Sequence, residues 1–236
     1  MSEVQRRKKK KLTAEDTLAK AEHLGLQRLA PAIIRVASQI FPYTSAAYAA
    51  YDEYNEWKLV KFLEELDAGE IELTEEDEQN YLMVHVFFSC WRYVGRTLRL
   101  EKIKLFARAF QNYCKTLAFE NEETTEIYDE YLAILDDLSY REFQILCILC
   151  EFEKAIGEER RDFWSEFFDS LELKLHISRN EIPAMLQRLN RTGLYHDVEG
   201  FLSSSEGLVR GKLTPNFYVF LELLGCHVAV PSSSDV

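Results

Sequence analysis

Glycine and proline are scarce in this chain of 236 residues, which contains 9 glycines and 5 prolines. Both residues interrupt helices, so their scarcity leaves few turns and favours long helices. The sequence also lacks an apolar run of ~18 residues, the length that a membrane-spanning helix needs. No apolar segment follows the basic N-terminus, as one would in a signal peptide. We therefore expect a globular, mainly helical protein without a membrane span.

Recognisable catalytic motifs are missing as well. The sequence has no glycine-rich loop that could cradle a phosphate, no HExxH zinc motif, and no serine or cysteine in a nucleophile motif. Its five histidines are scattered, and its acidic residues suggest no pair that could serve as acid and base. We expect a protein that is not an enzyme and that needs no cofactor or metal.

The cysteines give no sign of a metal or redox site. Cys147 and Cys150 form a CxxC inside the apolar segment FQILCILCEF, without a second Cys or His pair at ligand spacing. Zinc and redox chemistry need thiolates in a polar, accessible site. We expect this pair to be buried, reduced and metal-free in a cytoplasmic protein. The five cysteines, an odd number, are Cys90, Cys114, Cys147, Cys150 and Cys226.

Basic residues are fewer than acidic residues, 28 against 40, and are unevenly distributed along the chain. The net charge is −12, made up of +5 for residues 1–12 (6 basic, 1 acidic), −12 for residues 13–140 (12 basic, 24 acidic) and −5 for residues 141–236 (10 basic, 15 acidic). Phosphate neutralisation supplies most of the affinity of nonspecific DNA binding, so such binding is disfavoured. A dimer that reads a short site through two local basic patches remains open. The tail, with the run RRKKKK, is expected to be disordered and is either a polyanion-binding arm or a solubilising segment.

Apolar residues at helical spacing predict an all-α bundle over residues 13–138. The expected helices cover 13–25, 26–40 and 45–66, followed by one that Thr74 caps and by the segments EKIKLFARAFQNYCKTL and ETTEIYDEYLAILDDL. The short polar loops between them favour antiparallel neighbours.

The pattern changes at Ser139, where a second domain is expected over residues 139–227, with a tail at 228–236. Ser139 and Glu142 are spaced as a capping box that starts a nearly all-apolar helix. A helix over about 158–175 comes next, and then a third helix that starts near Asn180. Its core-facing residues are Ile182, Met185, Leu186 and Leu189. Gly193 fits a left-handed C-cap. The order is completed by a strand at LYHDV, a loop, a strand at LVRGKLT and a helix at PNFYVFLELL. Any strand in the protein should therefore follow Gly193.

Residues 139–225 resemble the winged helix-turn-helix domains of bacterial regulators. The segments that carry the resemblance are RLNRTGL, where the third helix runs into the first wing strand, and GKLTPNFYVFLELL, where the wing returns into a closing helix. The wing tip SSSEG departs from the DNA-binding pattern, because it carries Glu206 and no basic residue. The N-terminal half is loosely similar to uncharacterised bacterial helical domains, on the segments KFLEEL and EKIKLFA.

The third helix carries the candidate DNA-binding face. Arginine pairs with guanine in the major groove, and asparagine or glutamine pairs with adenine. The candidates are Arg179, Asn180, Gln187, Arg188 and Arg191, joined by Arg210 and Lys212 on the second wing strand. The same face could instead be a solvated surface or a protein-binding surface. A continuous positive surface would favour DNA, and acidic residues that interrupt it would favour protein contacts.

A second basic feature lies in the bundle. One polar stripe at helical spacing contains His85, Ser89, Arg92, Arg96 and Arg99. Its positive charge is extended by Lys102, Lys104 and Arg108. Arg92, Arg96 and Arg99 are therefore a candidate anion-binding stripe. We favour the alternative that the stripe pairs with the acidic helix that carries Glu122, Glu123, Glu126 and Glu130.

Two hypotheses for the function follow from these observations. The first is a winged-helix regulator that binds DNA as a dimer. The second is a non-enzymatic adaptor, or a subunit of a larger complex such as a bacterial defence system, that uses the winged helix for contacts with a protein partner or with itself.

Overall fold

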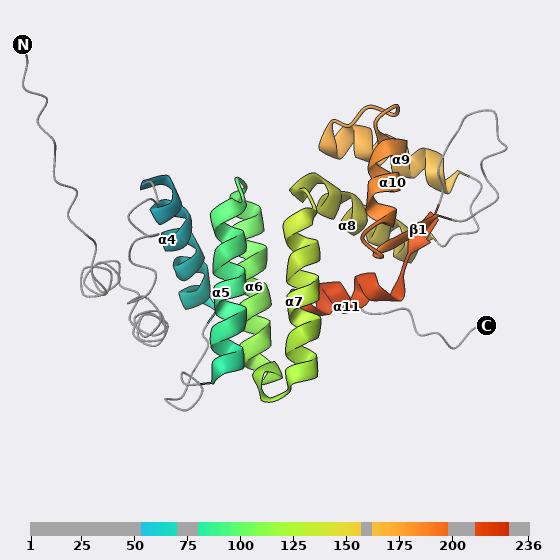
Figure 1. The fold of residues 1–236 in the computed structure, drawn as a ribbon. Helices are drawn as coiled ribbons and strands as arrows, with labels where there is room; N and C mark the ends of the chain where they lie inside the picture. The colour runs from blue at the N-terminus through green and yellow to red at the C-terminus, as the bar shows by residue number, and fades with distance from the viewer. Residues whose placement is uncertain (1–52, 70–79, 157–161, 198–210, 227–236) are drawn as a thin grey trace, which may run out of the picture. The chain divides into compact units, whose positions relative to one another are not determined.

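The computed structural model of the protein describes residues 53–69, 80–156, 162–197 and 211–226. These ranges hold eight α-helices and one antiparallel sheet of two strands, which confirms the mainly helical prediction. Both strands follow Gly193, as expected (Figure 1). The predicted basic tail, the first two predicted helices, the wing tip and the C-terminal tail lie outside the described residues. None of the helices in the described ranges combines the length and apolar character needed to cross a membrane.

Packing divides the chain into two units, residues 1–126 and residues 127–236. The division falls within α7 (Glu122–Asp137), earlier along the chain than the expected boundary at Ser139. The start of α7 belongs to the first unit, where the Thr125 and Tyr113 hydroxyls lie 2.8 Å apart. Its later part belongs to the second unit, where Tyr131 stacks on Phe220 with ring centroids 5.8 Å apart.

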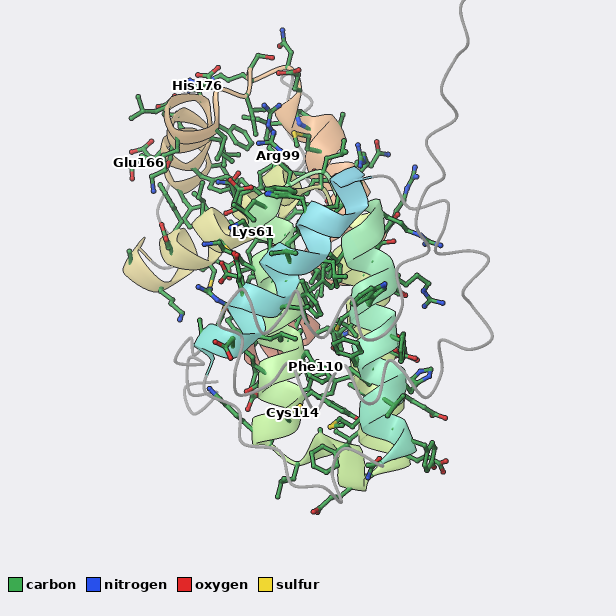
Figure 2. All side chains as sticks on the ribbon, turned by 90° about the vertical axis from the view of Figure 1, so that its left-hand side faces the viewer. Lys61, Arg99, Phe110, Cys114, Glu166 and His176 are labelled. Atoms are coloured by element: carbon green, nitrogen blue, oxygen red, sulfur yellow. The ribbon has the colours of Figure 1, made fainter. Side chains whose placement is uncertain are left out.

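The first unit is built from α4 (Glu53–Ala68), α5 (Tyr81–Arg96) and α6 (Leu100–Lys115), which pack against one another, and a short 3-10 helix, η3 (Ala118–Glu120). Aromatic rings fill the space between the helices. The Phe87 ring lies 6.0 Å from that of Phe62 and 5.5 Å from that of Phe110. Phe110 is buried together with Cys114 among these helices (Figure 2).

Asn80, and not Thr74, caps the start of α5. The Asn80 Oδ1 accepts hydrogen bonds from the amides of Leu82 (2.9 Å) and Met83 (3.4 Å). Thr74 lies outside the described residues, several positions before the first turn of the helix. An asparagine directly before the first turn satisfies two amides that the helix itself cannot pair, and this explains why α5 begins at Tyr81.

The second unit continues from α7 with α8 (Tyr140–Ile156), α9 (Phe163–Leu175) and α10 (Ile182–Asn190), followed by β1 (Tyr195–Asp197), β2 (Gly211–Leu213) and α11 (Pro215–Leu223). In α10, Ile182, Leu186 and Leu189 are fully buried, as predicted. Met185 is only half-buried, which corrects its assignment to the core. Gly193 has the left-handed backbone (φ 72°) expected after the helix.

The two cysteines of the CxxC differ in how deeply they are buried. Cys150 is buried, as predicted, but Cys147 is only partly buried, and the prediction that both are buried is therefore wrong. The five cysteines are free thiols. Burial raises the pKa of Cys147 to about 12, assisted by the neighbouring Cys226 and Cys150, so its thiolate is disfavoured at neutral pH.

Gly211 allows the two strands to pack closely together. Tyr195 pairs with Leu213, His196 with Lys212, and Asp197 with Gly211. A Cβ atom on Gly211 would lie 2.2 Å from the His196 carbonyl oxygen and 2.5 Å from the Tyr195 ring. The absence of a side chain at this position lets β2 approach the buried Tyr195.

We predict that Gly211→Ala lowers the free energy of unfolding by roughly 1–3 kcal/mol, because the new methyl group overlaps backbone and a buried ring. Urea unfolding followed by intrinsic fluorescence measures the change. Lys212→Ala is the matched control on the exposed face of the same strand, with an expected effect within about 0.5 kcal/mol. Equal stability of the two variants would contradict the prediction.

Candidate functional site

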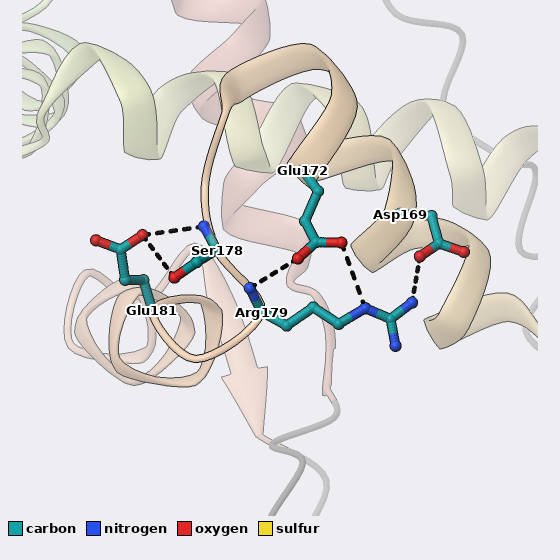
Figure 3. A network of polar contacts seen from close by, with 5 residues as sticks. All are labelled: Asp169, Glu172, Ser178, Arg179 and Glu181. Atoms are coloured by element: carbon teal, nitrogen blue, oxygen red, sulfur yellow. Dashed lines mark hydrogen bonds and ion pairs between the residues drawn. The ribbon is translucent and has the colours of Figure 1, made fainter.

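The turn that leads into α10 is fixed by one half of a capping box, named here the Ser178–Glu181 box, in which the glutamate side chain accepts hydrogen bonds from the serine. The Ser178 amide and hydroxyl both donate to Glu181 Oε2, at 3.0 Å and 2.9 Å (Figure 3). Ser178 and Glu181 have the same spacing as Ser139 and Glu142, a sequence signal that could have located this turn. The box places Arg179 and Asn180 in the turn, so neither belongs to α10, which begins at Ile182.

Arg179 is tied to the preceding helix. Its guanidinium forms ion pairs with Asp169 and, at 3.5 Å between Nε and Oε2, with Glu172 of α9 (Figure 3). Its backbone amide donates to Glu172 Oε1 at 3.0 Å. The hydrogen bond and charge of Asp169 raise the pKa of Arg179, followed by those of Glu172. Two carboxylates of the chain therefore engage the Nε and Nη2 donors of Arg179.

Arg188 is tied to the start of α8. Its Nε lies 3.0 Å from Glu142 Oε1, and its Nη2 donates to Glu142 Oε2 at 3.3 Å. The Glu142 side chain is only 3% exposed, whereas that of Arg188 is 61% exposed. The same carboxylate accepts the Ser139 amide at 2.8 Å, and the Glu142 amide donates to Ser139 Oγ at 3.2 Å. The predicted capping box is confirmed, and Arg188 joins it from α10.

The remaining candidates in the described ranges form no ion pair there. Asn180, Gln187 and Arg191 are exposed, as is Lys212 on β2. Arg210 lies outside the described residues. The structure thus places Gln187 and Arg188 on α10 and Arg191 at its C-cap. In the turn before α10, acidic residues engage Arg179 and Ser178. These acidic residues, all missed in the sequence, are Asp169, Glu172 and Glu181.

Glu153 of α8 was also missed, and it connects three elements. Its carboxylate accepts the Leu213 amide of β2 at 3.0 Å and the Tyr218 hydroxyl of α11 at 3.4 Å. Nearby, the Tyr195 hydroxyl is buried and has no hydrogen-bond partner among the described residues. Burial, and then the charges of Asp197 and Glu153, raise the pKa of Tyr195. Glu153 stands in an apolar stretch of sequence, and nothing in the local pattern identifies its partners 60 or more residues away.

The candidate anion-binding stripe is only partly a surface feature. Arg92, Arg96 and Arg99 are exposed, but Ser89 is 5% exposed and Lys102 is 7% exposed, so both belong to the interior.

Two basic residues of this region contact residues outside the acidic helix that we favoured, and the pairing of the stripe with that helix stays a prediction. Lys104 pairs with Glu65 of α4 at 3.2 Å. Arg92 lies 5.0 Å from the centre of the Tyr93 ring and donates to its hydroxyl at 3.4 Å. On α7, Glu122 accepts a hydrogen bond from Tyr81 at 2.7 Å.

No protein-family model matches the sequence, and comparisons with characterised proteins and with solved structures find no match. The resemblance of residues 139–225 to winged helix-turn-helix domains stays a prediction.

We predict that Arg188→Ala lowers the free energy of unfolding by roughly 1–3 kcal/mol, because it removes the charged partner of the buried Glu142 carboxylate. Arg191→Ala is the matched control, since it truncates the same side chain type on the same surface, where the described residues offer it no ion pair. Its effect should stay within about 0.5 kcal/mol. Chemical denaturation of both variants tests this, and a larger loss in Arg191→Ala would refute it.

The Ser178–Glu181 box should open in acid. Hydrogen bonds from the Ser178 amide, and then from its hydroxyl, lower the pKa of Glu181 because they favour the ionised carboxylate. A pKa that is lowered in the folded state means that the box stabilises the fold above the ordinary pKa. This contribution is lost as the pH falls through the lowered value.

An NMR titration of the Ser178 amide should therefore show a midpoint below 4.5, the ordinary value for the Glu181 carboxyl group. Ser178→Ala, read at its own amide, should move the midpoint upward because it removes the hydroxyl donor. If the midpoint is the same in both proteins, the hydroxyl does not hold the carboxylate.

Proposed function

We propose that the chain is a cytoplasmic, non-enzymatic adaptor whose second unit is a winged helix used for protein contacts. The observation that carries this proposal is the engagement of Arg179 and Arg188 by carboxylates of the chain itself. The order of three helices, a two-stranded antiparallel sheet and a closing helix supports the winged-helix assignment. In that fold the third helix, here α10, enters the major groove when the domain reads DNA.

Base reading through the Nε and Nη2 atoms of Arg179 would require the loss of existing interactions. Its side chain would have to leave Asp169 and Glu172, and its position in the turn is further fixed by its own amide. A bidentate base contact discriminates by about 1–3 kcal/mol, and the ion pairs that must be given up reduce that gain. Duplex phosphates would also approach the carboxylates of the turn, which repel them.

Contacts with a protein partner do not require the loss of these ion pairs. Gln187 is exposed on α10, Arg191 at the C-cap of this helix, and Asn180 in the turn before it. Amide and guanidinium groups form hydrogen bonds with peptide groups and side chains, and arginine is enriched at protein interfaces whereas lysine is depleted. The exposed part of α10 contains no lysine, in agreement with a protein-binding surface.

Sequence-specific DNA binding by a dimer is the second candidate, and one observation favours it. Glu142 engages the Nε and Nη2 atoms of Arg188, while more than half of this side chain stays exposed beside Gln187. A guanidinium held on one edge can present its other edge to a guanine at a lower entropic cost.

Site-specific photo-crosslinking in cells separates the two candidates. A photoreactive amino acid at Gln187 should yield a discrete crosslinked protein, whereas the same group at Glu166, exposed on α9, should not. Arg191→Glu in the Gln187-labelled protein should abolish the product while the chain stays folded.

The complementary measurement is selection from a randomised duplex pool with the purified full chain. The adaptor proposal expects no enriched sequence. An enriched sequence whose binding is weakened by Arg191→Ala and Gln187→Ala, two variants that leave the Glu142 ion pair intact, would overturn the proposal in favour of DNA.

A further inference from the structure

We propose that the last two turns of α5 and the loop after them form a docking surface for an acidic helix of a partner protein. This surface, the α5 stripe, consists of Phe88, Arg92, Arg96, Leu98 and Arg99. It lies in the first unit and does not depend on the function proposed for α10 in the second unit.

The sequence of α5 itself contributes no negative charge. The helix contains two arginines and a histidine but no Asp or Glu, in a chain with 40 acidic residues. Its exposed residues are Tyr81, His85, Arg92 and Arg96, which are spaced by multiples of about one turn and therefore lie on one line. The stripe therefore gathers exposed arginines on an acidic protein.

The described contacts of Arg92 do not neutralise its positive charge. The group stacked against it is the neutral phenol ring of Tyr93, at 5.0 Å, which also accepts its hydrogen bond. Arg99 is exposed at the end of the loop, where its carbonyl accepts the first amides of α6; it is labelled in Figure 2. Near this end of the helix, the buried Lys58 of α4 donates a hydrogen bond from its ammonium group to the Gly95 carbonyl at 3.0 Å.

Apolar side chains are interleaved with these charges. Leu98 is 77% exposed between Arg96 and Arg99, and Phe88 is partly exposed one turn before Arg92. Trp57 of α4, next in sequence to Lys58, is 42% exposed. A large exposed leucine in an otherwise polar loop marks an interaction surface when charged groups surround it. A ligand that matches the stripe must offer both carboxylates and apolar groups.

An acidic helix fits these requirements better than a nucleic acid. Carboxylates one turn apart on a helix have the same spacing as Arg92 and Arg96, and apolar residues between them can reach Leu98 and Phe88. The net charge of −12 repels an anion in proportion to the charge that the anion carries. This penalty is much greater for a polynucleotide than for a short peptide with a few carboxylates.

The chain itself provides a suitable probe. The sequence of α7, EETTEIYDEYLAILDD, has seven acidic residues, no basic residue, and Ile, Tyr and Leu side chains between them. We would measure fluorescence anisotropy of this peptide, labelled with fluorescein, during titration with the full chain at low salt. Saturable binding is expected, and it should weaken as the salt concentration rises from about 0.05 M to about 0.5 M.

Charge reversal identifies the binding surface. Arg92→Glu combined with Arg96→Glu should weaken peptide binding on the order of tenfold, because two attractive contacts become repulsive. Arg108→Glu combined with Lys115→Glu is the matched control on the exposed face of α6, with the same change of net charge. Its expected effect is about twofold or less. The milder pair Arg92→Gln and Arg96→Gln, checked by thermal unfolding, should give an intermediate loss.

Three outcomes would overturn the proposal. The first is the absence of saturable peptide binding, and the second is equal weakening by the stripe and control variants, which would show a nonspecific charge effect. The third is tighter binding of a single-stranded oligothymidine that the stripe substitutions abolish, which would assign the surface to nucleic acid. Substitutions at α10 should leave peptide binding unchanged, so failure of this proposal is distinguishable from failure of the adaptor proposal.

Discussion

The second unit depends on how the carboxylate of Glu142 is satisfied. A buried charge is costly unless hydrogen bonds and an opposite charge replace the lost water. Ser139 supplies an amide, and Arg188 supplies a guanidinium from α10. The start of α8 and the exposed face of α10 are therefore joined through one carboxylate. The polar side of α10 has a structural role before any ligand is considered.

The same arrangement recurs one turn before α10, where Asp169 and Glu172 engage Arg179. An arginine on the expected recognition surface is therefore not automatically a donor for a base, because the carboxylates of an acidic protein compete for it. Among the candidate basic side chains in the described residues, Arg179 and Arg188 have such competitors. The α5 stripe differs, because its helix contains no acidic residue and Arg92 rests on a neutral ring.

Periodicity and capping signals predicted much of the fold. The helical spacing located Ile182, Leu186 and Leu189 in the core, and the Ser139–Glu142 spacing predicted the capping box. The pairing of Glu142 with Arg188 was not predictable in the same way. These residues are 46 positions apart, and local patterns report which face of a helix is buried but not which charge lies opposite. Ser89 was assigned to a polar stripe by its residue type, yet its position on α5 faces the aromatic core.

The central claim is that Arg188 serves the fold through Glu142, and a double-mutant cycle tests it most directly. The free energy of unfolding would be measured for the unaltered protein, Glu142→Gln, Arg188→Ala and the double variant. We predict a coupling energy of roughly 1–2 kcal/mol, because each single change leaves the other partner without its ion pair, although solvent around Arg188 weakens the interaction. Additive effects, with a coupling energy below about 0.3 kcal/mol, would contradict the claim and leave Arg188 available for a ligand.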